Sequence, residues 1–139
     1  MTRPKDDLAS EADIQRAVVD HLRWRALDDV LWFACPNGGY RNRIEGAIFK
    51  GLGVVAGASD LMLIRGGRFH ALELKTARGR LSPAQRDFLR RVMTAGGLAA
   101  VSFGVDRAVA QLEQWGMLRP TRSDRIGASA IGHSPGIRR

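Results

Sequence analysis

Two short apolar segments, residues 60–65 and 68–75, are separated only by Gly66 and Gly67, and this arrangement constrains the fold more than any other feature of the sequence. Paired glycines between apolar segments are a strong signal of a two-residue β-hairpin, because the turn needs positive φ angles. Both segments are apolar at successive positions, so we expect helices to cover both faces of the resulting sheet. The pattern therefore predicts a hairpin inside a layered α/β fold.

The turn also determines which residues face each other across the hairpin. Counting outward from Gly66 and Gly67 places Asp60 opposite Glu73, on one face and with Cβ atoms about 5 Å apart. Lys75 lies two residues beyond Glu73 and shares that face. A bulge or a loop with an odd number of residues would shift this register by one residue.

The predicted cluster of two acids and one lysine suggests a metal site. Like charges that face each other are destabilising unless a cation lies between them. Oxygen ligands favour hard cations such as Mg²⁺ or Mn²⁺, which retain water that can act as a nucleophile. Lys75 would orient that water or neutralise charge growing on phosphorus, which suits phosphodiester hydrolysis. The alternative is structural: Asp60 begins a strand, Glu73 ends one, and Lys75 pairs with either.

The remaining periodicity predicts the other elements of one small α/β domain. It predicts a helix at 10–25 that Ser10 caps, a buried strand at 30–34, a helix from Ser82 to Gly96-Gly97, a parallel strand at 98–103 and a last helix at 106–115. Residues 41–51 are ambiguous between a short helix and a loop. The three tryptophans are expected in the core rather than at a base-stacking surface.

Length and composition limit the class of protein. The 139 residues suit one domain, and we expect an extension at 1–9, a folded domain at 10–118 and a disordered basic tail at 119–139. Nothing approaches the roughly 20 apolar residues of a membrane span, and the first residues do not form a signal peptide. A single cysteine, Cys35, excludes an internal disulfide framework. These features favour a cytoplasmic protein with no membrane partner.

The positive charge is concentrated in the middle of the chain. The formal net charge is +8, and residues 40–91 hold eleven basic and four acidic side chains. This distribution favours a polyanionic partner such as DNA. Arginines far outnumber lysines, which fits phosphate binding, although a coding bias would explain the same count equally well.

Five segments, taken in order, resemble the VRR-NUC domain, a virus-type replication–repair nuclease module of the PD-(D/E)XK superfamily. They are Glu11 with Ile14-Gln15, Pro36-Asn37-Gly38-Gly39, Gly57-Ala58-Ser59-Asp60, Glu73-Leu74-Lys75 and Leu81-Ser82-Pro83-Ala84-Gln85. The resemblance covers about residues 10–117. It departs from the family pattern at Ser59, where proline usually precedes the aspartate. It implies a restriction-endonuclease-like core, a central mixed β-sheet of about four strands flanked by helices.

The resemblance also implies roles for particular residues. Asp60, Glu73 and the Leu74 carbonyl would bind Mg²⁺ or Mn²⁺, and Lys75 would be the catalytic lysine. Glu11 would be a further ligand or hold water, although an acid there is also favoured by the helix dipole. Gln85 would lie near the metal and the scissile phosphate. A glutamine at that position also completes a capping box, and we expect one side chain to serve only one of these roles at a time.

The expected function is a metal-dependent DNA endonuclease of replication, repair or recombination, and relatives of this type suggest a homodimer acting on branched DNA such as four-way junctions. Several side chains and a glycine backbone are candidate DNA contacts: Asn37, Gly38, Arg41, Lys50, Arg78 and Arg80. Ordinary turns and solvated loop charges explain the same residues. Two alternatives remain, a DNA-binding module without catalysis and a sequence-specific restriction-type nuclease; a pure phosphate binder has no use for Asp60 opposite Glu73.

Overall fold

The hairpin is the centre of the fold. A computed structural model describes residues 9–36 and 43–121. Gly66 and Gly67 adopt φ angles of 57° and 74° and join β2 (Leu61–Arg65) to β3 (Arg68–Lys75). Met62 pairs with Ala71 and Arg65 with Arg68, so the predicted register is confirmed.

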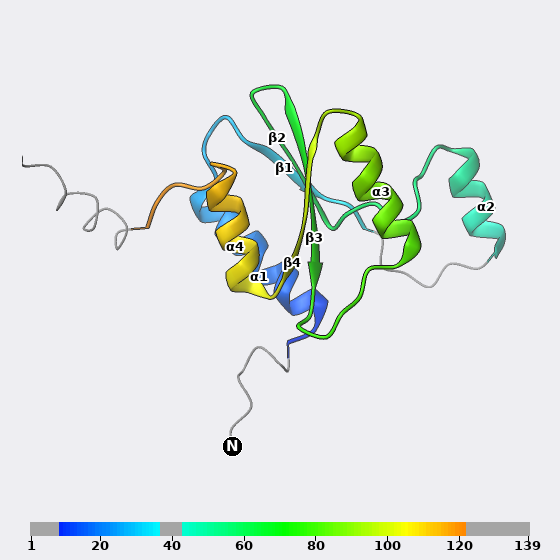
Figure 1. The fold of residues 1–139 in the computed structure, drawn as a ribbon, viewed down its shortest axis with the longest axis horizontal. Helices are drawn as coiled ribbons and strands as arrows, with labels where there is room; N and C mark the ends of the chain where they lie inside the picture. Colours follow the sequence, from blue (N-terminus) through cyan, green and yellow to red (C-terminus); the bar gives the residue numbers. More distant parts are fainter. Residues whose placement is uncertain (1–8, 37–42, 122–139) are drawn as a thin grey trace, which may run out of the picture.

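The sheet has four strands in the order β1-β2-β3-β4. Here β1 is Leu31–Ala34 and pairs antiparallel with β2, whereas β4 is Leu98–Phe103 and pairs parallel with β3. Helix α3 (Pro83–Thr94) supplies the crossover between β3 and β4, as a parallel pair requires. The expected mixed sheet flanked by helices is therefore present (Figure 1).

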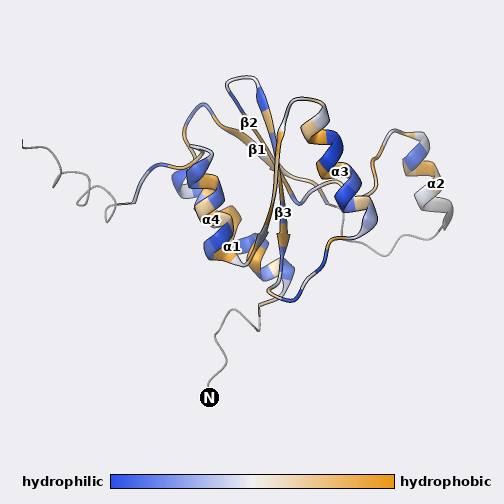
Figure 2. Cartoon of the chain, viewed as in Figure 1, coloured by the Kyte–Doolittle hydropathy of each residue, from blue (hydrophilic) through white to orange (hydrophobic). Residues whose placement is uncertain are grey.

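Helices cover the two faces of the sheet unequally. Helices α1 (Glu11–Arg25) and α4 (Val105–Gln114) pack on one face over a core that includes Leu61, Leu63 and Leu72. Helix α3 packs on the other face, over Met62 and Ala71. Figure 2 shows the hydrophobic residues along β3 and mixed polarity on the three helices. Each fully buried leucine contributes about 1.5–3 kcal/mol to folding.

Capping residues fix where α1 and α3 begin. The Ser10 hydroxyl accepts the Asp13 N–H at 3.1 Å, and the Asp13 carboxylate accepts the Ser10 N–H in return. Ser82 and Gln85 form the same reciprocal pair at α3. These boxes satisfy N–H groups that the first helical turn leaves without partners.

Helix α2 (Arg43–Gly51) resolves the ambiguity at residues 41–51 in favour of a short helix. It lies apart from the sheet in Figure 1, and Ile48 and Leu52 at its end are exposed.

Two predictions about burial are wrong. Strand β1 is an edge strand, and Leu31 and Phe33 are 60% and 44% exposed rather than buried. The reason is that α3 packs against β3 and β4 and does not extend over β1. Trp24 is 85% exposed on α1, whereas Trp32 and Trp115 pack partly against the core as expected.

None of the helices in the described residues is long and apolar enough to cross a membrane. Of the predicted tail at 119–139, residues 122–139 lie outside the described residues, as do residues 1–8. Arg119, the first residue of that predicted tail, is held against the domain by an ion pair with Asp28 and a hydrogen bond to the Ala26 carbonyl.

Candidate active site

The site begins where the chain enters β2. Asp60 immediately precedes β2, and its Oδ2 accepts the Leu74 N–H of the neighbouring strand at 2.7 Å. The Asp60 carbonyl accepts the Cys35 N–H at 3.0 Å, which fixes the backbone from the other side. One step beyond the Leu61–Leu72 pair, the register brings Asp60 opposite Glu73. The hairpin therefore brings the two predicted acids together.

Glu73 is the most deeply buried charged residue of the site. It is 2% exposed, and its Oε1 accepts the Gln85 Nε2–H of α3 at 2.9 Å. Its Oε2 is buried with no hydrogen-bond partner among the described residues. While Glu73 is ionised this oxygen has no donor, which is costly for a buried group; a proton shared with Asp60, or a cation between the two carboxylates, would satisfy it.

Gln85 connects the helix cap to the acidic pair. Its Oε1 accepts the Ser82 N–H at 2.8 Å, while its Nε2 donates to Glu73. The expectation that one side chain serves either the cap or the site was therefore wrong. An amide has an acceptor at one end and donors at the other, so it can fill both roles at once.

Lys75 lies between two carboxylates. Its Nζ is 3.4 Å from a Glu11 oxygen and 4.0 Å from Glu73 Oε1, and its side chain is only 8% exposed. Glu11 comes from the first turn of α1, which packs beside β3. Three elements thus bring together the lysine and the three acids that the sequence singled out.

The electrostatics of the site follow from burial and crowding. Burial first, and then the Asp60 carboxylate beside it, raise the pKa of Glu73 to about 8, although the Lys75 ammonium acts against both. Burial also raises the pKa of Asp60, although the Leu74 N–H bond lowers it. The Lys75 ammonium is the positive charge close to three carboxylates, those of Asp60, Glu73 and Glu11, so it does not balance their negative charge.

The donor set fits a hard divalent cation. Asp60 and Glu73 offer carboxylate oxygens, and Glu73 Oε2 has no hydrogen-bond donor in the part of the chain that the structure describes. Among the described residues no group of three or more His, Cys, Asp or Glu side chains could hold a metal ion together, and the contact given for Glu11 is with Lys75 Nζ, at 3.4 Å. The protein therefore offers two close carboxylates, and a cation there would complete its coordination with backbone oxygen or water.

One structural contact was not predicted. Gly57, in the loop before Asp60, has φ +75°, and a Cβ built on it would lie 2.4 Å from the Ala84 carbonyl carbon and 2.6 Å from the Gln85 nitrogen. The loop that leads to Asp60 therefore packs backbone to backbone on the first turn of α3. The sequence shows Gly57 shortly before Asp60, but it does not show that Gly57 contacts Ala84, which is 27 residues further along the chain.

The candidate DNA contacts are only partly described. Asn37, Gly38 and Arg41 lie outside the described residues. Arg78 and Arg80 are exposed on the segment after β3, close in sequence to Lys75. Lys50, at the end of α2, lines a hollow beside the loop before Asp60.

Comparison with known proteins identifies the family. The model of the VRR-NUC domain family matches residues 9–106. The chain belongs to the VRR-NUC family. A solved structure of a VRR_NUC domain protein has a similar fold, with a TM-score of 0.64 and 24% identity over 77% of this chain and 88% of that chain. A search of curated proteins found no significant match. Membership of the VRR-NUC family indicates a nuclease-type function that acts on DNA.

Ser59 is the position where this VRR-NUC chain departs from the expected proline. The residue is fully buried, and its hydroxyl has no hydrogen-bond partner among the described residues. Its side chain alternates with that of Asp60, so the substitution leaves the acidic face of the strand unchanged.

Proposed function

We propose that this VRR-NUC protein is a Mg²⁺- or Mn²⁺-dependent DNA endonuclease that hydrolyses phosphodiester bonds. One observation supports this most: Glu73 Oε2 is buried beside Asp60 with no donor among the described residues, and Lys75 Nζ lies 4.0 Å from Oε1 of the same carboxylate. A module that only binds phosphate gains nothing from a buried acidic pair, which would repel DNA.

The proposed metal ligands are Asp60, Glu73 and the Leu74 carbonyl, with Glu11 as an additional ligand or a holder of water. When bound, the cation supplies Lewis-acid activation of water and of the scissile phosphate. Glu73 must be deprotonated to bind it, so binding near neutral pH releases a proton. Gln85 fixes the rotation of the Glu73 carboxylate through Oε1 and leaves Oε2 available.

Lys75 is the proposed catalytic lysine. Its ammonium would orient the attacking water and stabilise the negative charge that develops on the phosphorus oxygens. Glu11 holds that ammonium at 3.4 Å, so it restricts the position of the lysine without neutralising it inside the core. Burial of the side chain keeps the ammonium poorly hydrated and strengthens its electrostatic effect.

The decisive test is plasmid cleavage in the presence of Mg²⁺, Mn²⁺ or EDTA. We expect Lys75→Ala and Asp60→Asn to reduce the cleavage rate by about 100-fold or more, because each removes a group that acts on the transition state. Asp20→Asn, the same chemical change on the exposed outer part of α1, should cleave like the wild type. DNA binding without cleavage under any of these metals would establish the alternative, a non-catalytic DNA-binding protein.

We also propose that the protein acts as a homodimer on branched DNA, such as four-way junctions. The candidate contacts to the DNA backbone are Asn37, Gly38, Arg41, Lys50, Arg78 and Arg80. In this proposal the shape of the DNA and the geometry of the dimer select the substrate. Sedimentation and a panel of linear, flap, splayed and four-way substrates test this. A monomer that cuts linear and branched DNA equally contradicts it, and discrete fragments from long DNA would favour a restriction-type enzyme.

A further inference from the structure

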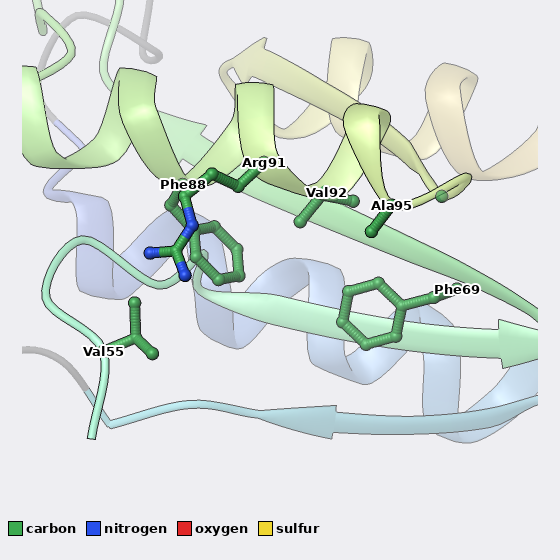
Figure 3. A pocket seen from close by; sticks show the side chains of 7 residues that line it. Val55, Phe69, Phe88, Arg91, Val92 and Ala95 are labelled. Atoms are coloured by element: carbon green, nitrogen blue, oxygen red, sulfur yellow. The ribbon is translucent and has the colours of Figure 1, made fainter. Parts of the chain in front are cut away.

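The face of the sheet that α3 covers holds an apolar groove that the proposed nuclease chemistry does not use. The groove encloses about 410 Å³. Its lining includes Val55, Phe69, Phe88, Arg91, Val92 and Ala95. Figure 3 shows Phe69 on β3 across from Val92 of α3 and from Ala95, the residue after α3, with Val55 on the loop that follows α2. We call this the α3 groove.

The groove is separate from the acidic site. Phe69 and Glu73 lie on the same strand and the same face, four residues apart, which corresponds to about 13 Å along β3. Val55 is 38% exposed, so the groove opens to solvent. A volume of this size accommodates one large apolar side chain with room for the backbone that bears it.

Arg91 gives the groove its charge. Arg91 lines the groove together with Phe88, and Figure 3 shows its guanidinium on the side of the groove where Val55 lies. The adjacent hollow shares Val55 and Arg91 and adds Lys50. Among the described residues that line the two hollows there is no aspartate or glutamate. The groove is thus apolar inside and positive at its rim.

This chemistry favours a peptide over a nucleic acid. A nucleobase in the groove would lose the water on its polar edge and find mainly carbon atoms in return, which is costly. A leucine or phenylalanine side chain loses nothing comparable, and the planar Arg91 guanidinium pairs two parallel hydrogen bonds with a carboxylate.

We propose that the α3 groove is a docking site for an acidic peptide segment of a partner protein. The segment inserts one apolar side chain between Phe69 and Phe88 and pairs an adjacent carboxylate with Arg91. Such a site would recruit the nuclease to a protein partner without occupying its acidic centre.

The test uses a fluorescein-labelled octapeptide with one central phenylalanine among aspartates and measures its fluorescence anisotropy with the full-length protein. We expect saturable binding that Arg91→Glu weakens by at least about tenfold, as removal of a central charged contact does. Ala95→Trp, which fills the groove, should weaken it similarly. The matched control is Arg90→Glu, the same charge change on α3 at a side chain that pairs with Asp87 and does not line the groove. Thermal melting confirms that each variant is folded.

Three outcomes would overturn the proposal. Equal losses for Arg91→Glu and Arg90→Glu would show general attraction to a basic protein. Equal binding of a peptide with serine in place of phenylalanine would show that the groove takes no side chain. A change from dimer to monomer in Ala95→Trp, without peptide binding by the wild type, would assign the groove to contact between two copies of this chain.

Discussion

At the residue scale, the Glu73 carboxylate is the group most dependent on its surroundings. One oxygen is held by Gln85 and the other has no partner among the described residues. A folded protein that bears this arrangement without a cation binds a proton more tightly than its unfolded chain does, because burial favours the neutral carboxyl. The acidic pair therefore links folding, pH and metal binding.

The pH dependence of stability follows from the raised pKa of Glu73. Its pKa rises from 4.5 to about 8 on folding, so the folded state retains a proton that the unfolded chain releases. The free energy of unfolding of the metal-free protein should therefore fall as the pH rises from about 4.5 to about 8. Glu73→Gln cannot titrate and should remove this slope. Urea unfolding in EDTA across the interval measures both proteins; parallel curves would contradict the prediction.

Gln85 and Ser82 allow the cap and the site to be tested separately. Gln85→Glu keeps an oxygen for the Ser82 N–H but turns the donor toward Glu73 into a second carboxylate, so we expect cleavage to fall at least about tenfold. Ser82→Ala removes the capping hydroxyl and should cost about 1 kcal/mol of stability while cleavage persists. Thermal melts and cleavage rates of both variants test this; loss of activity in Ser82→Ala alone would show that the cap, not the amide, matters.

Which residues meet at the site could largely be read from the sequence. The two-glycine turn fixes the register, so the positions of Asp60, Glu73 and Lys75 follow from counting. The double use of Gln85 could not be predicted, because it depends on how close the first turn of α3 comes to β3. The exposure of Trp24 was also beyond sequence reasoning, since periodicity predicts a helix but not how far its neighbours extend over each face.

At the element scale, the active site depends on one close contact between a loop and a helix. Gly57 packs against the backbone of Ala84 and Gln85, which holds the loop before Asp60 on the first turn of α3. Gln85, which donates to Glu73, lies in the same turn of α3. The contact at Gly57 therefore fixes the position of the loop before Asp60 relative to Gln85.

Gly57→Ala tests this contact with an unusually good control. The substitution adds a Cβ within 2.4 Å of the Ala84 backbone, so the loop or the helix must shift. We expect a loss of about 1–3 kcal/mol of stability and reduced cleavage in the protein that remains folded. Gly53→Ala has the same left-handed backbone, φ +85°, but nothing within 4 Å. Melting temperatures and cleavage rates compare the two, and equal effects would mean that backbone strain alone is responsible.

The elements themselves were predicted better than their burial. Helix caps and the hairpin are local signals, so α1, α3, β2 and β3 begin and end close to the expected residues. Strand β1 was expected to be buried because its residues are apolar. Its exposure is decided by its position at the edge of the sheet and by the reach of α3, neither of which its own sequence encodes.

At the scale of the whole molecule, part of the positive charge that would attract DNA lies outside the segments that hold the proposed site residues. Residues 122–139 carry four arginines and one aspartate, a net charge of +3, and none of the proposed site residues. Removing them should make the salt dependence of DNA binding shallower by a slope of up to about 3 while cleavage persists. Binding titrations at several salt concentrations measure the slope; loss of cleavage at low salt in the truncated protein would assign the tail a role in the reaction.

Leu31 and Phe33 are exposed on β1, and no strand of the described residues pairs with the outer side of β1. An exposed edge strand promotes aggregation, because a strand of another molecule can pair with it and bury both side chains. We therefore expect the protein to associate as its concentration rises, which increases the light that the solution scatters. A Phe33→Lys substitution, by putting a charge on that strand, should raise the onset concentration measurably in static light scattering; an unchanged onset would place the cause of precipitation elsewhere on the surface.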